Sequence, residues 1–158
     1  MEEAYPYFPL FVDLSEKKLL VVGTGAIARR RILTLAQFVP RLRVIAPETD
    51  PALDPLEAAG KLEILRRPYA PGDAAGADLV LAATGDPAVN AAVGEECRRL
   101  GIPVNLSSDR HGSDFYFPGI ARQGHLVVGV TASGRDHAAA RRVTEQARGM
   151  LAEGEQKV

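Results

Sequence analysis

A run of apolar residues that ends in two closely spaced glycines constrains this chain more than any other feature. The segment KKLLVVGTG covers residues 17–25, and its apolar part has the length of a buried strand that leads into a tight turn. The following segment, 26–39, carries apolar side chains at helical spacing, namely Ile32, Leu35, Ala36 and Val39. A strand, a glycine turn and a helix in this order predict the first unit of a parallel α/β sheet.

The same alternation continues to about residue 106. Further strands are predicted at 41–47, 61–67, 77–85 and 102–106. A second helix is predicted at 86–100, with Asp86 as N-cap, Pro87 at the first helical position and Gly101 after its end. This order predicts a Rossmann-like, doubly wound parallel sheet.

The pattern changes after residue 113. Segment 114–134 predicts two strands joined near Gln123 and Gly124, and a final helix is expected at about 136–152. We therefore divide the chain into a nucleotide-binding domain, 1–112, and a hairpin with a helix, 113–158. The second part is too small to form a hydrophobic core by itself, and its helix has an apolar face. This indicates pairing with a second copy, a homodimer.

The glycine turn carries the first functional signal. Gly23, Gly25 and Ala28 match the pattern G-x-G-x-x-A between a strand and a helix. Gly23 would permit the turn, Gly25 would let the backbone approach a pyrophosphate, and Ala28 would allow close helix packing. Ala26 and Ile27 would place their backbone N–H groups at the phosphates. The competing interpretation is a corner that only needs glycines.

Two further segments favour dinucleotide binding. Glu48 ends the next strand 20 residues after Ala28, where an acid binds the adenosine ribose and disfavours the 2′-phosphate of NADP. We therefore predict NAD as the cofactor. Thr84 and Gly85, in AATGD, would lie along the same edge of the sheet and cover the cofactor. The alternative for AATGD is a capped helix start, and both can hold.

Composition narrows the function classes. The net charge is −1, which gives no case for nucleic acid or an anionic membrane as partner. The chain has one cysteine and three dispersed histidines, so neither a disulfide framework nor a metal site is expected. MEEAYPYFPL does not have the pattern of a signal peptide, and no apolar run reaches the ~20 residues of a membrane span. We expect a soluble, cytoplasmic protein.

Several blocks of the sequence resemble the N-terminal module of siroheme synthase. They are FPLFVDLSEKKLLVVGTGAIA, AATGDPAVN, PVNL, DFYFPGI and GHLVVGVTASG, and the resemblance extends over about residues 8 to 145. The resemblance implies a Rossmann-like domain, a dimerisation region and NAD-dependent oxidation of precorrin-2 to sirohydrochlorin. Some members of the family also insert Fe²⁺ into sirohydrochlorin.

The loop after PVNL departs from the family. Family members place an aspartate, the proposed general base, three residues after the asparagine; here Ser108 follows Asn105 at that distance. A serine hydroxyl is not basic near neutral pH unless another group activates it. The candidate catalytic residues are therefore Ser108, Asp109, His111 and Asp114, with Asn105 among the cofactor-binding residues.

Two functions remain open. The first is an NAD-dependent precorrin-2 dehydrogenase, in which Arg110, Arg135, Arg141 and Arg142 are candidates for binding substrate carboxylates. The second is a non-catalytic relative that holds NAD or a tetrapyrrole and assists another haem-pathway enzyme. Ser108 and the short segment after the hairpin favour the second, whereas the glycine motif, Glu48 and Asp114 favour the first. Ferrochelatase activity is not expected.

Overall fold

The computed structural model describes residues 5–155. Its internal contacts divide the chain into two compact units. The first unit comprises residues 13–117, and the second combines the segment that ends at Val12 with the chain from Pro118 onward. The units thus meet in sequence five residues after the predicted boundary at 112/113, and the dimerisation role of the second unit stays a prediction.

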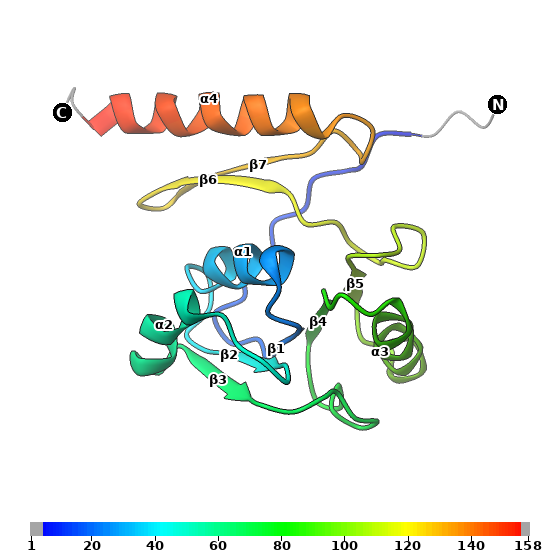
Figure 1. Cartoon of the computed structure of the whole chain (residues 1–158). Helices are drawn as coiled ribbons and strands as arrows, with labels where there is room; N and C mark the ends of the chain where they lie inside the picture. Colours follow the sequence, from blue (N-terminus) through cyan, green and yellow to red (C-terminus); the bar gives the residue numbers. More distant parts are fainter. Residues whose placement is uncertain (1–4, 156–158) are drawn as a thin grey trace. The chain divides into compact units, whose positions relative to one another are not determined.

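The first unit is built on a five-stranded parallel sheet (Figure 1). Its strands are β1 (Leu19–Val22), β2 (Leu42–Ile45), β3 (Leu62–Leu65), β4 (Leu79–Ala82) and β5 (Val104–Leu106). Their spatial order is β3-β2-β1-β4-β5, and every neighbouring pair is parallel. The predicted Rossmann-like fold is confirmed.

Both faces of this sheet are buried by apolar side chains of the neighbouring helices. On one face, the strands pack against α1 (Ala26–Leu35), and the cluster includes Val21, Val44, Leu81, Ala28 and Ile32. On the other face, they pack against α3 (Pro87–Leu100), and the cluster includes Leu20, Val22, Val80, Val93 and Cys97. Successive strand residues point to opposite faces, so a strand that is covered on both sides must be apolar throughout. A short 3-10 turn, η1 (Pro51–Leu53), and α2 (Asp54–Ala58) connect β2 to β3.

The first helix is shorter than the expected 26–39. It ends at Leu35, where the backbone N–H groups of Gln37 and Phe38 turn back to the carbonyls of Thr34 and Leu35. Pro40 disfavours helical backbone only at Val39, so the end at Leu35 comes from this tighter turn and not from the proline. Ala36 and Val39 are nevertheless buried, as the apolar pattern predicts.

The second long helix begins and ends as predicted. The Asp86 carboxylate accepts a hydrogen bond from the backbone N–H of Ala88 at 2.8 Å, and Pro87 is the first helical residue. Gly101 follows with φ 68°, a left-handed conformation that glycine adopts without strain.

The two strands predicted within 114–134 are present, but the first, β6, begins only at Gly119. The aromatic residues before it pack into the first unit instead. Phe115 and Phe117 pack against the core cluster beneath α1. The backbone of Asp114 donates to the carbonyl of Val104, so the segment follows β5 without joining the sheet.

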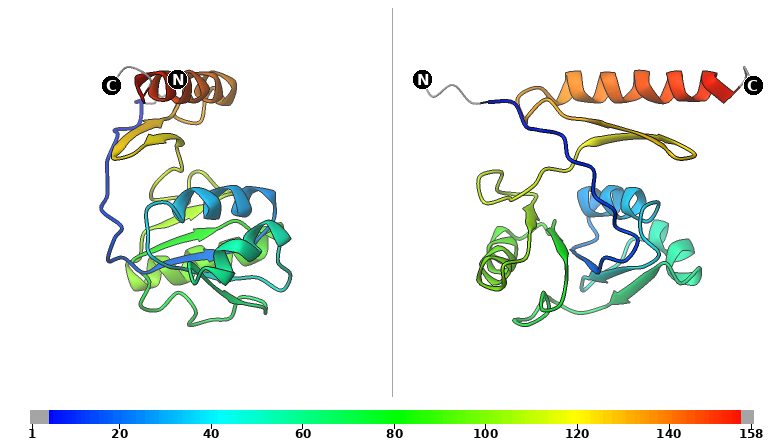
Figure 2. Two further views of the ribbon diagram at one scale, coloured as in Figure 1. Left: turned by 90° about the vertical axis from the view of Figure 1, so that its left-hand side faces the viewer. Right: turned by 180° about the vertical axis from the view of Figure 1, so that it is seen from behind.

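The second unit is an antiparallel hairpin with a long helix. Strands β6 (Gly119–Gln123) and β7 (Leu126–Val130) pair across the predicted turn, and α4 (His137–Glu155) lies along them (Figure 2). Asp136 caps α4, because its carboxylate accepts from the backbone N–H of Ala139 at 2.8 Å. A side chain at Gly119 would collide with the buried Thr144, so helix and hairpin touch at a small residue.

Gly23 gives a stability prediction. Its φ is 108°, and an added Cβ would lie 2.5 Å from the Ala83 carbonyl oxygen, so Gly23→Ala should lower the free energy of unfolding by about 2 kcal/mol or more. Gly25→Ala is the matched control, because no atom lies within 4 Å of its added Cβ and its φ is −61°. Thermal and urea unfolding of both variants measure the difference. Equal stabilities would contradict the prediction.

Candidate functional site

The site lies where the order of the sheet reverses. From β1 the chain proceeds to β2 and β3 on one side, and it returns to β4 and β5 on the other. The loops after β1 and β4 therefore leave the same edge in opposite directions, which opens a crevice at the carboxyl ends of these strands. The close approach of Gly23 to Ala83 joins the two loops at this point.

The start of α1 fits a phosphate group. No side chain caps the helix at Gly25, and its first turn holds no acidic residue. Gly25 faces open space, Ala26 and Ile27 are exposed, and Ala28 is fully buried against the sheet. The first N–H groups of a helix need acceptors and carry partial positive charge, so an uncapped start is suited to a dinucleotide pyrophosphate.

Glu48 lies beside the glycine turn with an exposed side chain. The Thr24 hydroxyl donates to the Glu48 carbonyl at 2.6 Å and ties the loop after β2 to the loop after β1. This bond fixes the backbone of Glu48 in the part of the site where the adenosine ribose is expected. Arg43, which precedes it on β2, is engaged with Glu63 at 3.4 Å.

A buried asparagine, which the sequence analysis did not single out, organises the edge after β4. The side chain of Asn90, 1% exposed, accepts from the backbone N–H of Thr84 at 3.0 Å and from its hydroxyl at 2.8 Å. Its amide nitrogen donates to the Thr84 carbonyl and to the Ser108 hydroxyl, both at 3.1 Å. Asn90 thus links the predicted cofactor loop at Thr84 and Gly85 to the predicted catalytic loop.

One signal could have identified Asn90. It shares a face of α3 with Val93, Gly94 and Cys97, all of which are buried. A polar side chain on an apolar helix face must find hydrogen-bond partners, which marks the residue for attention. Cys97 on the same face is an inert thiol, since burial raises its pKa to about 11.

The four predicted catalytic residues fall into two groups. Ser108 and His111 have exposed side chains, in the loop that follows β5. Asp109 and Asp114 instead hold the loop together. The Asp109 carboxylate accepts from the backbone N–H groups of His111 and Gly112, and the Asp114 carboxylate accepts from that of Val104 at 2.9 Å. Their catalytic roles stay predictions.

Asn105 is buried in β5, and both ends of its side-chain amide already have a hydrogen-bond partner. Its amide donates to the Phe115 carbonyl at 2.8 Å, and its oxygen accepts from Arg31 at 2.6 Å. The Arg31 guanidinium also lies 5.3 Å from the centre of the Phe117 ring. Burial, with a smaller contribution from the charge of Arg30, lowers the pKa of Arg31. Asn105 therefore shapes the floor beside the site, and its contact with the cofactor stays a prediction.

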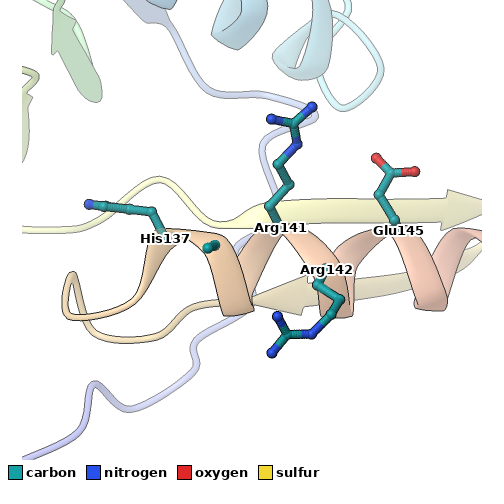
Figure 3. Close-up of a pocket in the computed structure, with 5 residues that line it drawn as sticks. His137, Arg141, Arg142 and Glu145 are labelled. Atoms are coloured by element: carbon teal, nitrogen blue, oxygen red, sulfur yellow. The ribbon is translucent and has the colours of Figure 1, made fainter.

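The arginines considered for substrate carboxylates are spread over the chain. Arg110 follows β5, whereas Arg141 and Arg142 line a shallow pocket at the start of α4 with His137, Ala138 and Glu145 (Figure 3). Arg141 and Arg142 extend to opposite sides of the helix in this view. Within residues 5–155, no cluster of three histidine, cysteine, aspartate or glutamate side chains is placed to hold a metal ion.

Comparison with known proteins places the chain among nucleotide-binding proteins. A family model described as "Putative NAD(P)-binding" matches residues 10–119. Siroheme synthases from Stutzerimonas stutzeri (strain A1501) and Pseudomonas putida (strain W619) are 40% and 41% identical over 128 residues, 81% of this chain. Siroheme synthase 1 from Serratia proteamaculans (strain 568) is 33% identical over 145 residues, 92% of this chain. The resemblance to siroheme synthase is confirmed.

These relatives are much longer than the chain, which spans 28% of the first two and 30% of the third. A solved structure titled "SirC, precorrin-2 dehydrogenase" has the same fold, with a TM-score of 0.74 and 24% identity. The match covers 94% of this chain and 76% of that one. In the part of the chain that the structure describes, no helix combines the length and apolar character that a membrane span requires.

Glu48 allows a test of cofactor choice. We expect Glu48→Ser to weaken NAD⁺ binding about tenfold and to reduce the preference over NADP⁺, because a carboxylate hydrogen bond to the ribose is lost. Glu63→Ser is the control, since that carboxylate lies on β3 and pairs with Arg43. Titration calorimetry with both cofactors measures the dissociation constants. Unchanged NAD⁺ affinity in Glu48→Ser would contradict the assignment.

Proposed function

Because the chain belongs to this NAD(P)-binding family, we propose that it is an NAD-dependent dehydrogenase that oxidises precorrin-2 to sirohydrochlorin. The observation that carries the proposal is the uncapped start of α1 at the switch point of the sheet, beside the loop after β4. Asn90 ties that loop to the loop after β5. The substrate is proposed by analogy with the relatives, which are siroheme synthases, and with the structural neighbour, a precorrin-2 dehydrogenase.

The residues that would hold NAD all lie at this edge. Gly23 and Gly25 would let the backbone come close to the cofactor, and the N–H groups of Ala26 and Ile27 would bind the pyrophosphate. The Glu48 carboxylate would accept from the ribose. Thr84 and Gly85 form the opposite wall. When bound, NAD⁺ supplies the acceptor for a hydride.

Oxidation also releases a proton, and a group near the loop after β5 must accept it. The resemblance places Ser108 at the position of the family's aspartate, yet a serine hydroxyl is a poor base. His111 is exposed in the same loop, and an imidazole is the side chain that most often transfers protons in catalysis. We assign proton transfer to His111 or to solvent and treat Asp109 and Asp114 as residues that hold the loop. Arg110 is proposed to bind a substrate carboxylate.

The alternative is a module that binds NAD or a tetrapyrrole without turnover. Ser108 in place of an acid favours it, because loss of a general base costs about 100-fold or more. The two functions differ in whether the parent protein turns precorrin-2 over and in how turnover responds to Ser108→Asp.

Turnover decides between the two functions. We expect the purified protein to convert precorrin-2 anaerobically with NAD⁺, followed by absorbance, and we expect Ser108→Asp to bring no gain in kcat. NAD⁺ binding is measured on the same samples. Binding without turnover, or a gain of about 100-fold in Ser108→Asp, would establish the binding module instead.

We further propose a homodimer formed through the second unit, in the cytoplasm. In this unit, several large apolar side chains are exposed: Leu126, Val143 and Met150, together with Tyr5, Phe8, Leu10, Phe11 and Val12 of the N-terminal segment. Few residues are buried in the unit, among them Ala121 and Thr144. A hairpin with one helix buries too little apolar surface to be stable by itself, and a second copy would cover it.

The oligomeric state can be tested with single substitutions. Leu126, 65% exposed, and Met150, 73% exposed, should each shift the dimer towards monomer when replaced by Asp, because a charge at an interface centre must be desolvated. Leu100→Asp is the control, an exposed leucine of the first unit on α3. Light scattering after size-exclusion chromatography measures the mass. A monomeric parent protein would refute the proposal.

A further inference from the structure

The orientation of the Asn90 side chain is determined by its neighbours. Its oxygen faces the backbone N–H of Thr84, which can only donate, and its nitrogen faces the Thr84 carbonyl, which can only accept. An amide turned the other way would place donor against donor and acceptor against acceptor. The remaining N–H of Asn90 therefore points to the Ser108 oxygen, 3.1 Å away.

This contact decides what Ser108 can do. A hydroxyl has one proton to donate and two lone pairs, and Asn90 occupies one lone pair. A serine oxygen that accepts from an amide is an even weaker base, while its own proton remains available. The Ser108 side chain is exposed, so this proton can reach a ligand in the site.

We propose that Asn90 is a positioning residue that makes Ser108 a hydrogen-bond donor to the tetrapyrrole. The inference rests on the proposed function, since it takes its ligand from there. The donor would meet an acceptor of the substrate, a carboxylate oxygen or a ring nitrogen lone pair. Through Thr84 the same amide holds the cofactor loop, so one buried side chain sets both walls of the site.

The arrangement explains how a serine serves at a position where the family places an aspartate. An aspartate there would also accept from Asn90, but it would bring a negative charge and no proton. Ser108 instead presents a neutral donor. The proton of the reaction would then go to another group, either the exposed His111 or solvent.

The test compares Ser108→Ala, Ser108→Thr and Asn90→Asp. Anaerobic titration with sirohydrochlorin, the product, reports the donor without requiring turnover, and titration with NAD⁺ reports the cofactor loop. We expect Ser108→Ala to weaken sirohydrochlorin binding and to lower kcat about tenfold each, with NAD⁺ affinity unchanged. Ser108→Thr keeps the hydroxyl and should retain both within about threefold. Ser107→Ala is the control, a neighbouring serine whose backbone N–H bonds to Ala82.

Asn90→Asp reverses the hydrogen bond, because a carboxylate would draw the Ser108 proton towards itself. It should weaken sirohydrochlorin binding about tenfold and also weaken NAD⁺ binding, since an oxygen now faces the Thr84 carbonyl. In the Ser108→Ala background, Asn90→Asp should cause no further loss of sirohydrochlorin affinity. A purely structural Asn90 would give additive losses instead.

Each outcome separates the two proposals. Parent-level sirohydrochlorin affinity and kcat in Ser108→Ala would overturn the donor role, even if Asn90→Asp fails to fold. A parent protein that binds sirohydrochlorin without oxidising precorrin-2 would overturn the dehydrogenase but leave the donor role measurable by binding. A parent protein that does not bind sirohydrochlorin would overturn both.

Discussion

The site depends on a close approach between two backbones. Gly23 lies so near the Ala83 carbonyl that no side chain fits between them, and its positive φ turns the chain into α1. The ends of β1 and β4 can therefore lie side by side, with one loop on each side of the crevice. A larger residue would separate the glycine turn from the loop at Thr84, and the pyrophosphate position with it.

Three side-chain hydrogen bonds, from a loop, a helix and a strand, then hold this edge together. Thr24 ties the loop after β2 to the glycine turn, Asn90 ties the loop after β4 to that after β5, and Asn105 ties β5 to Arg31 of α1. Burying such groups stabilises a single arrangement only when each finds its partner. Preorganised loops of this kind suit a reaction in which a hydride must travel between two closely placed molecules.

Element boundaries shifted where local pattern and tertiary packing compete. The aromatic residues after Asp114 alternate as a strand would, yet Phe115 and Phe117 pack into the first unit, and their backbone follows β5 instead of pairing. For Asp109 and Asp114 the catalytic role stays a prediction, and the folded chain adds that their carboxylates accept from backbone N–H groups. Sequence reveals that a carboxylate is present, but only the folded chain reveals which donors it meets.

The sequence by itself determined the parallel sheet, the glycine turn, the caps of α3 and the place of Glu48. These features follow from local causes. They are the spacing of apolar residues along the chain, the positive φ that only glycine adopts freely, and side chains that hydrogen-bond to the backbone a few residues away. The link from Asn90 to Ser108 and the cation of Arg31 over Phe117 were decided by tertiary structure alone. They join residues 18 and 86 positions apart, or bring together groups whose orientation depends on the packing of whole elements.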